Sequence, residues 1–517
     1  MKLIPTLRKA TIFLTLLFFA LVYLPKAQAM ISSIEIKSST PYGIFKAGEF
    51  IRIEGVITGA LSPTERIPGI DKAPVNAAGQ IAYKSPFVII MPKDASKANG
   101  SLLIDVPNRG RPISHFLYNS GRENFQPLEL NARSGFLQHQ GFTVAMVQWE
   151  LGQGIELPSF KNAEGEVRYV EGVGLAVIRD FASFLRTGLR RQGLMNPLAG
   201  TTERVLAVGY SQTARVLKTM LVEGFNTIGG RRVFDGMHIH AAASGVADIL
   251  ATGKGPASST FFTPRFTHPE HRGVTEEPLS YQDIVSRDKL RNGNPLGSPR
   301  LLVTNATTDY LSIRASLART GAKGVVDLPI PDNVRIYDIA GASHGRASEK
   351  TCEQLPGQLD FFPVMRSTLL HLHQWVSDNT KPPESRLMPL EALPGEPTLL
   401  QAPAHLPGAI VQAPKRDADG NSLGGVRLPE LEVPLGTHGA QNLPLSDRAC
   451  NLNAAYIPFA RNPGERKAGD TRVALSERYK SAEDYLAKLK AAADKLVTQG
   501  FLLKEDADLI FKQAPRP

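Results

Sequence analysis

Cysteine is nearly absent from this 517-residue chain, which contains only Cys352 and Cys450. In an oxidising compartment two such cysteines are expected to form one disulfide, and the alternative is a pair of buried thiols. Long hydrophobic runs are also lacking beyond residue 24, so no later stretch is expected to span a bilayer. The sequence therefore predicts no stable membrane anchor.

Runs of basic residues interleaved with aromatic side chains are absent too, although the formal net charge is +10. Four of the positive charges precede residue 30, and the remaining excess is spread along the chain. A mild, dispersed excess of this kind argues against a nucleic-acid partner. The hydrophobic content of 42% is that of a globular protein able to bury a large core.

Residues 1–29 have the composition of a secretory signal peptide. Basic residues precede an apolar run at residues 10–24, and the sequence A-Q-A at residues 27–29 matches a cleavage site. The alternative is a retained membrane anchor, for which the run is short. We therefore expect a mature chain that begins at Met30 and is exported, either to a periplasm or out of the cell.

The central part of the chain predicts an α/β fold. Apolar, strand-like segments lie at residues 101–106, 141–149, 205–208, 237–243, 300–304 and 333–339, and amphipathic helical segments at residues 172–187, 312–319 and 362–376 and directly after residue 211. This alternation indicates right-handed crossovers and a mostly parallel, doubly wound sheet. Segments at residues 33–36, 50–54 and 87–91 predict antiparallel strands that flank it.

We expect four parts: a signal peptide at residues 1–29, an α/β core at 30–380, an extended Pro/Gly-rich arm packed on that core at 381–470, and a C-terminal helical segment at 471–517. Within the core, residues 244–299 are rich in Gly, Pro, Thr and Arg and have weak periodicity. Such a long irregular insertion is expected to form a lid over the catalytic edge of the sheet. In the last part, Ser481 and Asp484 predict a helix cap.

Residues 205–215 predict a buried strand, a tight turn that carries Ser211, and the start of a helix. The turn sequence G-Y-S-Q-T is close to the nucleophile elbow G-x-S-x-G, which exposes a serine hydroxyl beside a helix N-terminus. Thr213 stands where the second glycine permits close packing of helix on strand. By this pattern alone, Ser211 is either a nucleophile or an ordinary serine between a strand and a helix.

The order serine, acid, histidine that an α/β-hydrolase requires is also present. Asp309 follows the strand at residues 300–304, and His344 follows the strand at 333–339 between two glycines. His344 would take the proton of Ser211, and Asp309 would hold the imidazole in the correct tautomer. The alternatives for the acid are Asp327, Asp332 and Asp248, and the alternative for His344 is a surface loop histidine.

A developing oxyanion needs N–H donors placed in advance. One is expected from the backbone amide of Gln212, the residue after the nucleophile. The other is expected from the loop after the strand at residues 101–106, which contains Asn108, Arg109 and Gly110. The alternative for this loop is a turn without a catalytic role.

Several motifs occur together along the chain: G-Y-S-Q-T-A-R at residues 209–215, G-F-N at 224–226, V-F-D-G at 233–236, V-P-N-R-G at 106–110, T-N at 304–305, D-Y at 309–310, H-G at 344–345, D-A-D-G-N at 417–421 and E-R-Y at 477–479. In this combination, which covers nearly the whole mature chain, the sequence resembles a little-characterised bacterial family of exported α/β-hydrolase-domain proteins. The resemblance implies a serine-hydrolase fold in which Ser211, Asp309 and His344 act together.

The chain departs from that family in two places. Ala214 stands where the family commonly has glycine, and residues 309–311 read D-Y-L where it commonly has E-Y-W. A shorter acid can do the same work but requires a different loop position. The resemblance therefore implies fold and mechanism rather than substrate.

Two further patterns suggest metal binding but are incomplete. His238 and His240 lie on one face of a predicted strand without an evident third ligand, which favours buried histidines over a metal pair. Residues 417–421 begin like a calcium loop, but Ser422 and Leu428 stand where glycine and a bidentate glutamate belong, which favours a turn. We expect no metal and no cofactor.

The sequence as a whole predicts an exported serine hydrolase that cleaves a small-molecule or polymeric carboxylic ester through an acyl-enzyme on Ser211. Cleavage of amides or lactones, or acyl transfer to another acceptor, uses the same triad and is the alternative among enzymes. A noncatalytic binding protein that keeps the fold is the alternative of another class. The oligomeric state is not indicated.

Overall fold

The computed structural model describes residues 30–121, 130–187, 194–247, 274–275, 279–292, 297–345, 352–357, 359–392, 408–444 and 448–516. The predicted signal peptide, most of the predicted lid-like insertion and the alternative acid Asp248 lie outside these described residues. Within the described ranges, no helix has both the length and the apolar character needed to cross a bilayer.

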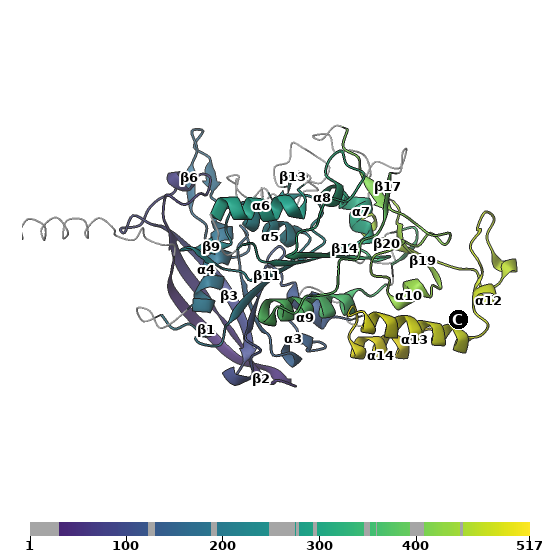
Figure 1. Cartoon of the computed structure of the whole chain (residues 1–517). Helices are drawn as coiled ribbons and strands as arrows, with labels where there is room; N and C mark the ends of the chain where they lie inside the picture. Colours follow the sequence, from purple (N-terminus) through teal and green to yellow (C-terminus); the bar gives the residue numbers. More distant parts are fainter. Residues whose placement is uncertain are drawn as a thin grey trace, which may run out of the picture.

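A nine-stranded sheet runs through the molecule (Figure 1). Its strands are, in spatial order, β1 (Met30–Phe45), β2 (Gly48–Leu61), β3 (Ile81–Pro92), β5 (Thr143–Val147), β4 (Ser101–Asp105), β8 (Arg204–Tyr210), β11 (Gly236–His240), β14 (Arg300–Ala306) and β15 (Val334–Ile339). The pairs from β1 to β5 are antiparallel. Every pair from β5 to β15 is parallel. The predicted mostly parallel sheet with N-terminal antiparallel strands is confirmed.

Helices cover both faces of the parallel strands. One face carries α4 (Val173–Thr187), α5 (Gln212–Val222) and α6 (Tyr281–Asn292), and the other carries α2 (Ser114–Asn119), α3 (Phe136–His139) and α9 (Phe362–Asp378) (Figure 1). In β8, Val205 and Ala207 pack into the first core, and Leu206 and Val208 pack into the second. The unbroken apolar run of this strand follows from burial on both sides.

The predicted helix at residues 312–319 is wrong in its boundaries. Two short helices, α7 (Thr307–Ile313) and α8 (Leu317–Thr320), take its place, and Arg314 ends α7 with φ 55°. Because α7 starts directly after β14, Asp309 lies in the first turn of a helix rather than in a loop. Its carboxylate Oδ2 accepts the backbone N–H of Ala306 at 2.6 Å, which stabilises this helix start.

The arm, residues 381–470, contains short elements of its own. These are β17 (Leu390–Ala392), β18 (Gln412–Pro414), α10 (Pro429–Glu432), β19 (Gly436–Gln441), α11 (Arg448–Asn451) and β20 (Ala454–Pro458). β20 pairs with β19 and also with β16 (Leu355–Pro356), which follows the last strand of the large sheet. The Cys352–Cys450 disulfide, with 5.5 Å between the Cα atoms, joins the same two regions.

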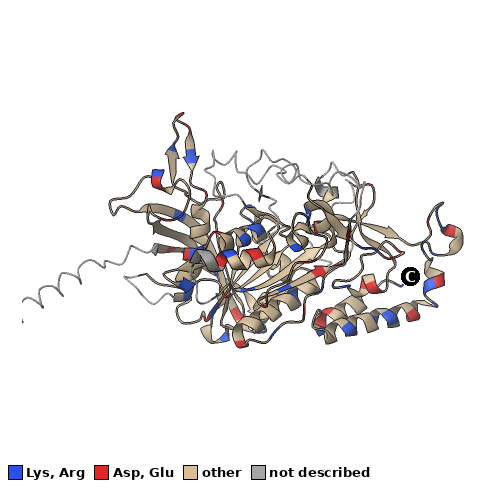
Figure 2. Cartoon of the chain, turned by 45° about the horizontal axis from the view of Figure 1, so that its top comes forward, with Lys and Arg blue, Asp and Glu red and all other residues tan. Residues whose placement is uncertain are grey.

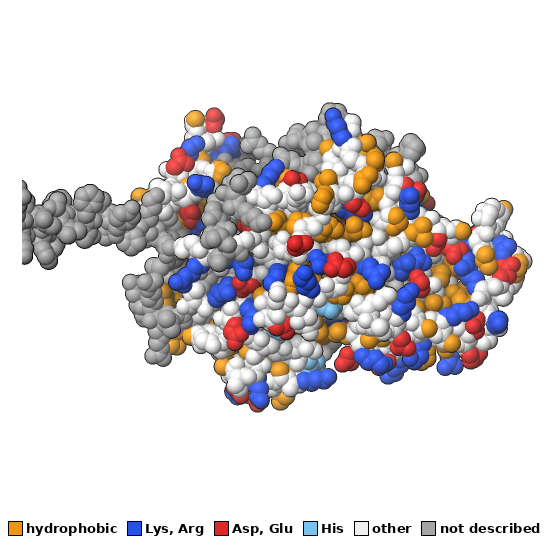
Figure 3. Space-filling model, viewed as in Figure 1, with side chains coloured by type: hydrophobic (Ala, Val, Ile, Leu, Met, Phe, Trp, Pro, Cys, Tyr) orange, Lys and Arg blue, Asp and Glu red, His pale blue; other side chains and the backbone are white. Residues whose placement is uncertain are grey.

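The C-terminal segment contains α12 (Leu475–Arg478), α13 (Ala482–Thr498) and α14 (Lys504–Lys512). The predicted cap is present, since the Ser481 hydroxyl accepts the Asp484 N–H at 3.2 Å. Positive and negative side chains are interspersed along α13 and α14 (Figures 2 and 3), including the pair Lys490–Asp494. Three small antiparallel pairs lie outside the large sheet: β6 (Ser159–Lys161) with β7 (Val167–Tyr169), β9 (Thr227–Ile228) with β10 (Arg231–Arg232), and β12 (Val246–Ala247) with β13 (Val274–Thr275).

Candidate active site

Ser211 lies on a strained turn between β8 and α5. Its φ of 57° and ψ of −110° are unusual for a residue with a side chain, and its N–H donates to the carbonyl of His240 at 2.9 Å. A Cβ on Gly209 would lie 2.5 Å from the carbonyl oxygen of Thr213, so only glycine fits before the turn. This is the backbone geometry of a nucleophile elbow.

Thr213, which replaces the second glycine of the elbow pattern, is fully buried and closes the turn with its side chain. Its hydroxyl oxygen accepts the backbone N–H of Tyr210 at 3.0 Å and lies 3.2 Å from the Tyr210 carbonyl oxygen, to which it can donate. Ala214, the other departure, is fully buried in the core on the same side of the sheet as α4. A threonine therefore fits this position without opening the turn.

The three side chains of the predicted triad lie together in one hydrogen-bonded chain. His344 Nε2 is 2.9 Å from Ser211 Oγ, and His344 Nδ1 is 2.6 Å from Asp309 Oδ1. Ser211, Asp309 and His344 follow β8, β14 and β15, whose carboxyl ends meet at one edge of the parallel sheet. The shorter aspartate thus reaches the imidazole from the first turn of α7.

Asp309 and His344 are both shielded from solvent. Asp309 is fully buried, and the exposed fraction of His344 is 6%. The second carboxylate oxygen of Asp309 is held by the Ala306 N–H, so the carboxylate cannot rotate without losing that hydrogen bond. The Asp309 carboxylate is therefore fixed in orientation by hydrogen bonds at both of its oxygens.

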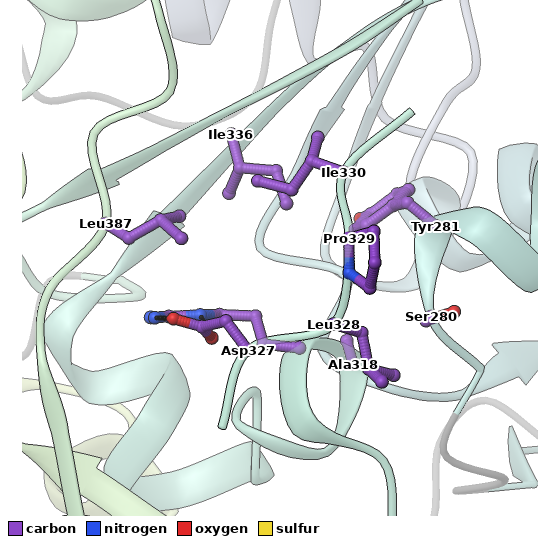
Figure 4. A pocket seen from close by; sticks show the side chains of 10 residues that line it. Ser280, Tyr281, Ala318, Asp327, Leu328, Pro329, Ile330, Ile336 and Leu387 are labelled. Carbon is purple, nitrogen blue, oxygen red and sulfur yellow. Dashed lines mark hydrogen bonds and ion pairs between the residues drawn. The ribbon is translucent and has the colours of Figure 1, made fainter. Parts of the chain in front are cut away.

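Two of the alternative acids lie elsewhere. Asp327 Oδ2 is 2.6 Å from Arg319 Nη2, and Figure 4 shows it lining a small pocket that includes neither Ser211 nor His344. Asp332 is exposed and precedes β15, so it lies at the opposite end of that strand from His344. Among the described candidates, Asp309 is the one in contact with the imidazole.

Tyr210 contributes to the site in a way that the sequence did not indicate. Its hydroxyl donates to the backbone carbonyl of His344, and the two ring centroids are 5.4 Å apart. The Tyr210 ring also stacks on the ring of His240, with 5.1 Å between the two centroids. The only signal was its place before the serine, a position where the elbow pattern accepts any residue.

A second group missed from the sequence supports the helix that carries Asp309. The carboxylate of Asp338 is fully buried and accepts hydrogen bonds from Tyr310 at 2.8 Å, Arg319 at 2.9 Å and Asn305 at 3.0 Å. Burial raises the pKa of Asp338, and the guanidinium of Arg319 opposes this. An aspartate inside the apolar run of β15 was the available signal.

The loop proposed for the second oxyanion donor is a tight turn beside the elbow. The N–H of Asn108 donates to the carbonyl of Arg111, and the side-chain amide of Asn108 donates to the carbonyl of Tyr210 at 3.1 Å. Arg109 and Gly110 both have positive φ. The Asn108 N–H is hydrogen-bonded within the turn and so is not available to an oxyanion. The predicted oxyanion donors are therefore reduced to the N–H groups of Arg109 and Gly110, together with that of Gln212 at the start of α5.

The two sequence patterns that suggested metal binding, His238 with His240 and the turn at residues 417–421, make hydrogen bonds or ion pairs to other protein side chains. His238 Nε2 and His240 Nδ1 both lie within 2.9 Å of Thr304 Oγ1, and burial lowers the pKa of His240 to about 4. In the calcium-like turn, the carboxylate of Asp419 is held by the guanidinium of Arg478. No cluster of three or more histidine, cysteine or acidic side chains able to hold a metal ion occurs in the described part of the chain.

Residues 130–512 match the family described as "Alpha/beta hydrolase domain". The chain belongs to this alpha/beta hydrolase family. The match includes Ser211, Asp309 and His344, and it agrees with the doubly wound sheet and the elbow described above. No curated protein matches the chain.

The solved structures to which the chain is similar include several esterases. The cell wall degrading esterase LipA from Xanthomonas oryzae is 13% identical over 60% of this chain and 90% of its own, with a TM-score of 0.29. A glucuronoyl esterase from Solibacter usitatus is 13% identical over 60% of this chain and 83% of its own, with a TM-score of 0.28. A glucuronoyl esterase from Teredinibacter turnerae is 12% identical over 60% of this chain and 76% of its own, also with a TM-score of 0.28.

Proposed function

We propose that this alpha/beta hydrolase is an exported serine hydrolase that cleaves carboxylic esters. The observation that carries the proposal is the hydrogen-bonded chain from Asp309 through His344 to Ser211, at 2.6 and 2.9 Å. A serine hydroxyl is a weak nucleophile at neutral pH and needs an adjacent base. His344 is placed to be that base.

In the acylation step, Ser211 Oγ attacks the ester carbonyl while its proton passes to His344 Nε2. The charge that develops on the imidazolium is stabilised by Asp309, whose buried carboxylate accepts from His344 Nδ1. The imidazolium then donates its proton to the departing alcohol, and an acyl-enzyme ester on Ser211 remains.

In the deacylation step, water takes the place of the alcohol. His344 accepts a proton from this water as it attacks the acyl carbonyl, and then returns the proton to Ser211 Oγ as the carboxylic acid leaves. No cofactor is required, because the triad both forms and hydrolyses the covalent intermediate.

The negative oxygen of each tetrahedral intermediate needs donors that are already in place. The N–H of Gln212 suits this role, because the first residue of a helix has no intrahelical acceptor for its N–H. The Asn108–Tyr210 hydrogen bond holds the turn that contains Arg109 and Gly110 against the elbow, and Trp149 Nε1 binds the Pro107 carbonyl at 2.9 Å. A second donor from this turn completes the proposed oxyanion hole.

Export is proposed from two features. The first 29 residues have the composition of a signal peptide. The Cys352–Cys450 disulfide also suits an oxidising compartment. N-terminal sequencing of protein recovered from cytoplasmic, periplasmic and culture fractions tests this directly. Protein that starts at Met30 in the periplasm or the medium supports export, and protein that keeps Met1 and stays in the cytoplasm contradicts it.

The experiment that tests the chemistry is labelling of the purified protein with a fluorophosphonate probe, which reacts covalently with activated serines. We expect labelling of the wild type and its loss in both Ser211→Ala and His344→Ala. Turnover of p-nitrophenyl acetate and p-nitrophenyl butyrate is expected to fall by about 10⁴-fold or more in the same variants.

The outcomes separate the alternatives. A folded wild type that is not labelled supports a noncatalytic binding protein with this fold. Labelling without turnover of esters, but with turnover of p-nitroanilides or lactones, supports amide or lactone cleavage by the same triad. Longer p-nitrophenyl esters then measure the acyl length that the site accepts.

A further inference from the structure

We infer that Thr308 is a positioning residue, whose hydroxyl links the arm to the backbone of His344 and thereby sets the place of the catalytic imidazole. This inference rests on the proposed function. Thr308 is the second residue of α7 and directly precedes Asp309, so one short segment would present the acid and also hold the base.

The Thr308 hydroxyl makes two hydrogen bonds of different kinds. Its oxygen accepts the backbone N–H of His344 at 2.6 Å, and its proton is donated to the carbonyl of Leu452 at 3.2 Å. The exposed fraction of Thr308 is 1%, so water does not replace these partners. Because the proton is directed toward Leu452 in the arm, a lone pair is left facing His344.

The neighbouring contacts hold the rest of the histidine loop, residues 340–345, in the same way. Thr307 Oγ1 accepts the Gly341 N–H at 2.8 Å. The arm also contacts the loop directly, because Ser343 Oγ accepts the Ala454 N–H at 2.8 Å. The loop is thus held by hydrogen bonds to α7 and to the start of β20.

Among these contacts, the Thr308 hydroxyl is the one that reaches His344 itself. A buried N–H that loses its acceptor carries a substantial free-energy penalty, which the loop can relieve only by moving. Such a movement would shift His344 relative to both Ser211 and Asp309. Displacements of about 1 Å in a catalytic group are enough to lower a rate by about 100-fold.

The test substitutes Thr308 in the full-length exported protein. Thr308→Val keeps the shape of the side chain and removes the hydroxyl, and Thr308→Ser keeps the hydroxyl. We expect Thr308→Val to lower kcat for p-nitrophenyl butyrate by about 10- to 100-fold, with KM changed by less than about twofold because no substrate contact is lost. Thr308→Ser is expected to restore kcat to within about threefold of the wild type, since it retains both hydrogen bonds.

Ser312 supplies a matched control. It lies one helical turn further along α7, and its hydroxyl donates to the carbonyl of Asn451, next to Leu452 in the same arm segment. Ser312→Ala therefore removes a hydroxyl link between the same helix and the same arm without touching the histidine loop. We expect it to lower thermal stability to an extent similar to Thr308→Val while kcat stays at the wild-type value.

Fluorophosphonate labelling rates separate this inference from the proposed function. A wild type that does not label contradicts the proposed function. A wild type that labels, together with Thr308→Val that labels and turns over at the wild-type rate, overturns the positioning role. Equal losses of kcat in Thr308→Val and Ser312→Ala also overturn it, since they would reflect stability alone. If Thr308→Val does not fold, Thr308→Ala, which buries no methyl group against the N–H, is judged by the same criteria.

Discussion

The hydroxyl oxygen of Thr213 accepts the backbone N–H of Tyr210 at 3.0 Å across the turn that carries Ser211. This hydrogen bond explains how the chain tolerates a threonine where the elbow pattern has glycine. The Thr213 side chain folds back onto Tyr210, the last residue of β8. The turn is therefore held by a side chain as well as by the backbone contact between Ser211 and His240.

Substitution of Thr213 is expected to destabilise the protein even when it restores the familiar pattern. Thr213→Val leaves the buried Tyr210 N–H without an acceptor and should lower the free energy of unfolding by about 1–3 kcal/mol. Thr213→Gly matches the elbow pattern but removes the same acceptor and gives the unfolded chain more conformational freedom. It should therefore also lower the free energy of unfolding. Chemical denaturation of both variants beside Thr213→Ser measures this, and a Thr213→Gly variant more stable than wild type would contradict it.

Asp309 is expected to be the acid on which activity depends. Asp309→Asn should lower kcat by about 10⁴-fold, because an amide can hold the imidazole in the wrong tautomer and cannot stabilise its positive charge. Asp327→Asn, which alters the contact with Arg319 away from the triad, should stay within about threefold of the wild type. Steady-state kinetics with p-nitrophenyl butyrate distinguish the two, and a larger loss in Asp327→Asn would assign the acid differently.

Stability is expected to decrease in acid because buried histidines are held neutral. Burial, with the positive charges of Arg133 and Arg52, lowers the pKa of His115 from 6.5 to about 3. The unfolded chain binds a proton below pH 6.5 and the folded chain does not until about pH 3, so the stability present above pH 6.5 is lost as the pH falls through this window. The loss from His115 alone between pH 7 and pH 5 is about 2 kcal/mol.

The comparison that isolates this effect uses His115→Gln, with urea denaturation at pH 7 and at pH 5. The variant should lose about 2 kcal/mol less than the wild type over this interval. Asp105, whose pKa burial raises to about 6, acts in the opposite direction but does so equally in both proteins. An equal loss of stability in both proteins would show that the pKa of His115 does not differ between the folded and unfolded states.

Loss of the Cys352–Cys450 disulfide is expected to lower stability. The two cysteines are 98 positions apart, and a loop of this size corresponds to a stabilisation of about 2–5 kcal/mol through the unfolded state. The double variant Cys352→Ser and Cys450→Ser should therefore unfold at a lower temperature than the wild type. Reductant should lower the Tm of the wild type and leave the variant unchanged, whereas peptide mapping that finds two free thiols in exported protein would contradict the bridge.

Much of the sheet could be predicted because its strands are locally distinctive. The run at residues 205–208 is apolar at every position, and only a strand covered on both faces buries such a run completely. In much of β2 and β3, buried side chains alternate with half-buried or exposed ones, a period of two that is visible in the residues themselves. The boundaries of α7 could not be predicted, because its start depends on the hydrogen bond between Asp309 and the Ala306 N–H.

The serine and histidine of the candidate site were accessible from the sequence, whereas the choice of acid was not settled by it. Asp309, Asp327 and Asp332 all lie between the same two strands, and chain order admits each of them. Distance from the imidazole decides among the described candidates, and distance is a property of the folded chain. The roles of Thr308 and Tyr210 were hidden for the same reason, since their partners lie far away in the sequence.

By itself, then, the sequence determined the class of the fold, the elbow at Ser211 and the order of the triad, because hydrophobic periodicity and turn chemistry are local. Only the tertiary structure decided that Asp309 is the acid in contact with His344, that Thr213 closes the elbow, and that the arm reaches the histidine loop through Thr308. Each of these depends on hydrogen bonds and packing between segments that meet only when the parallel strands align their carboxyl ends.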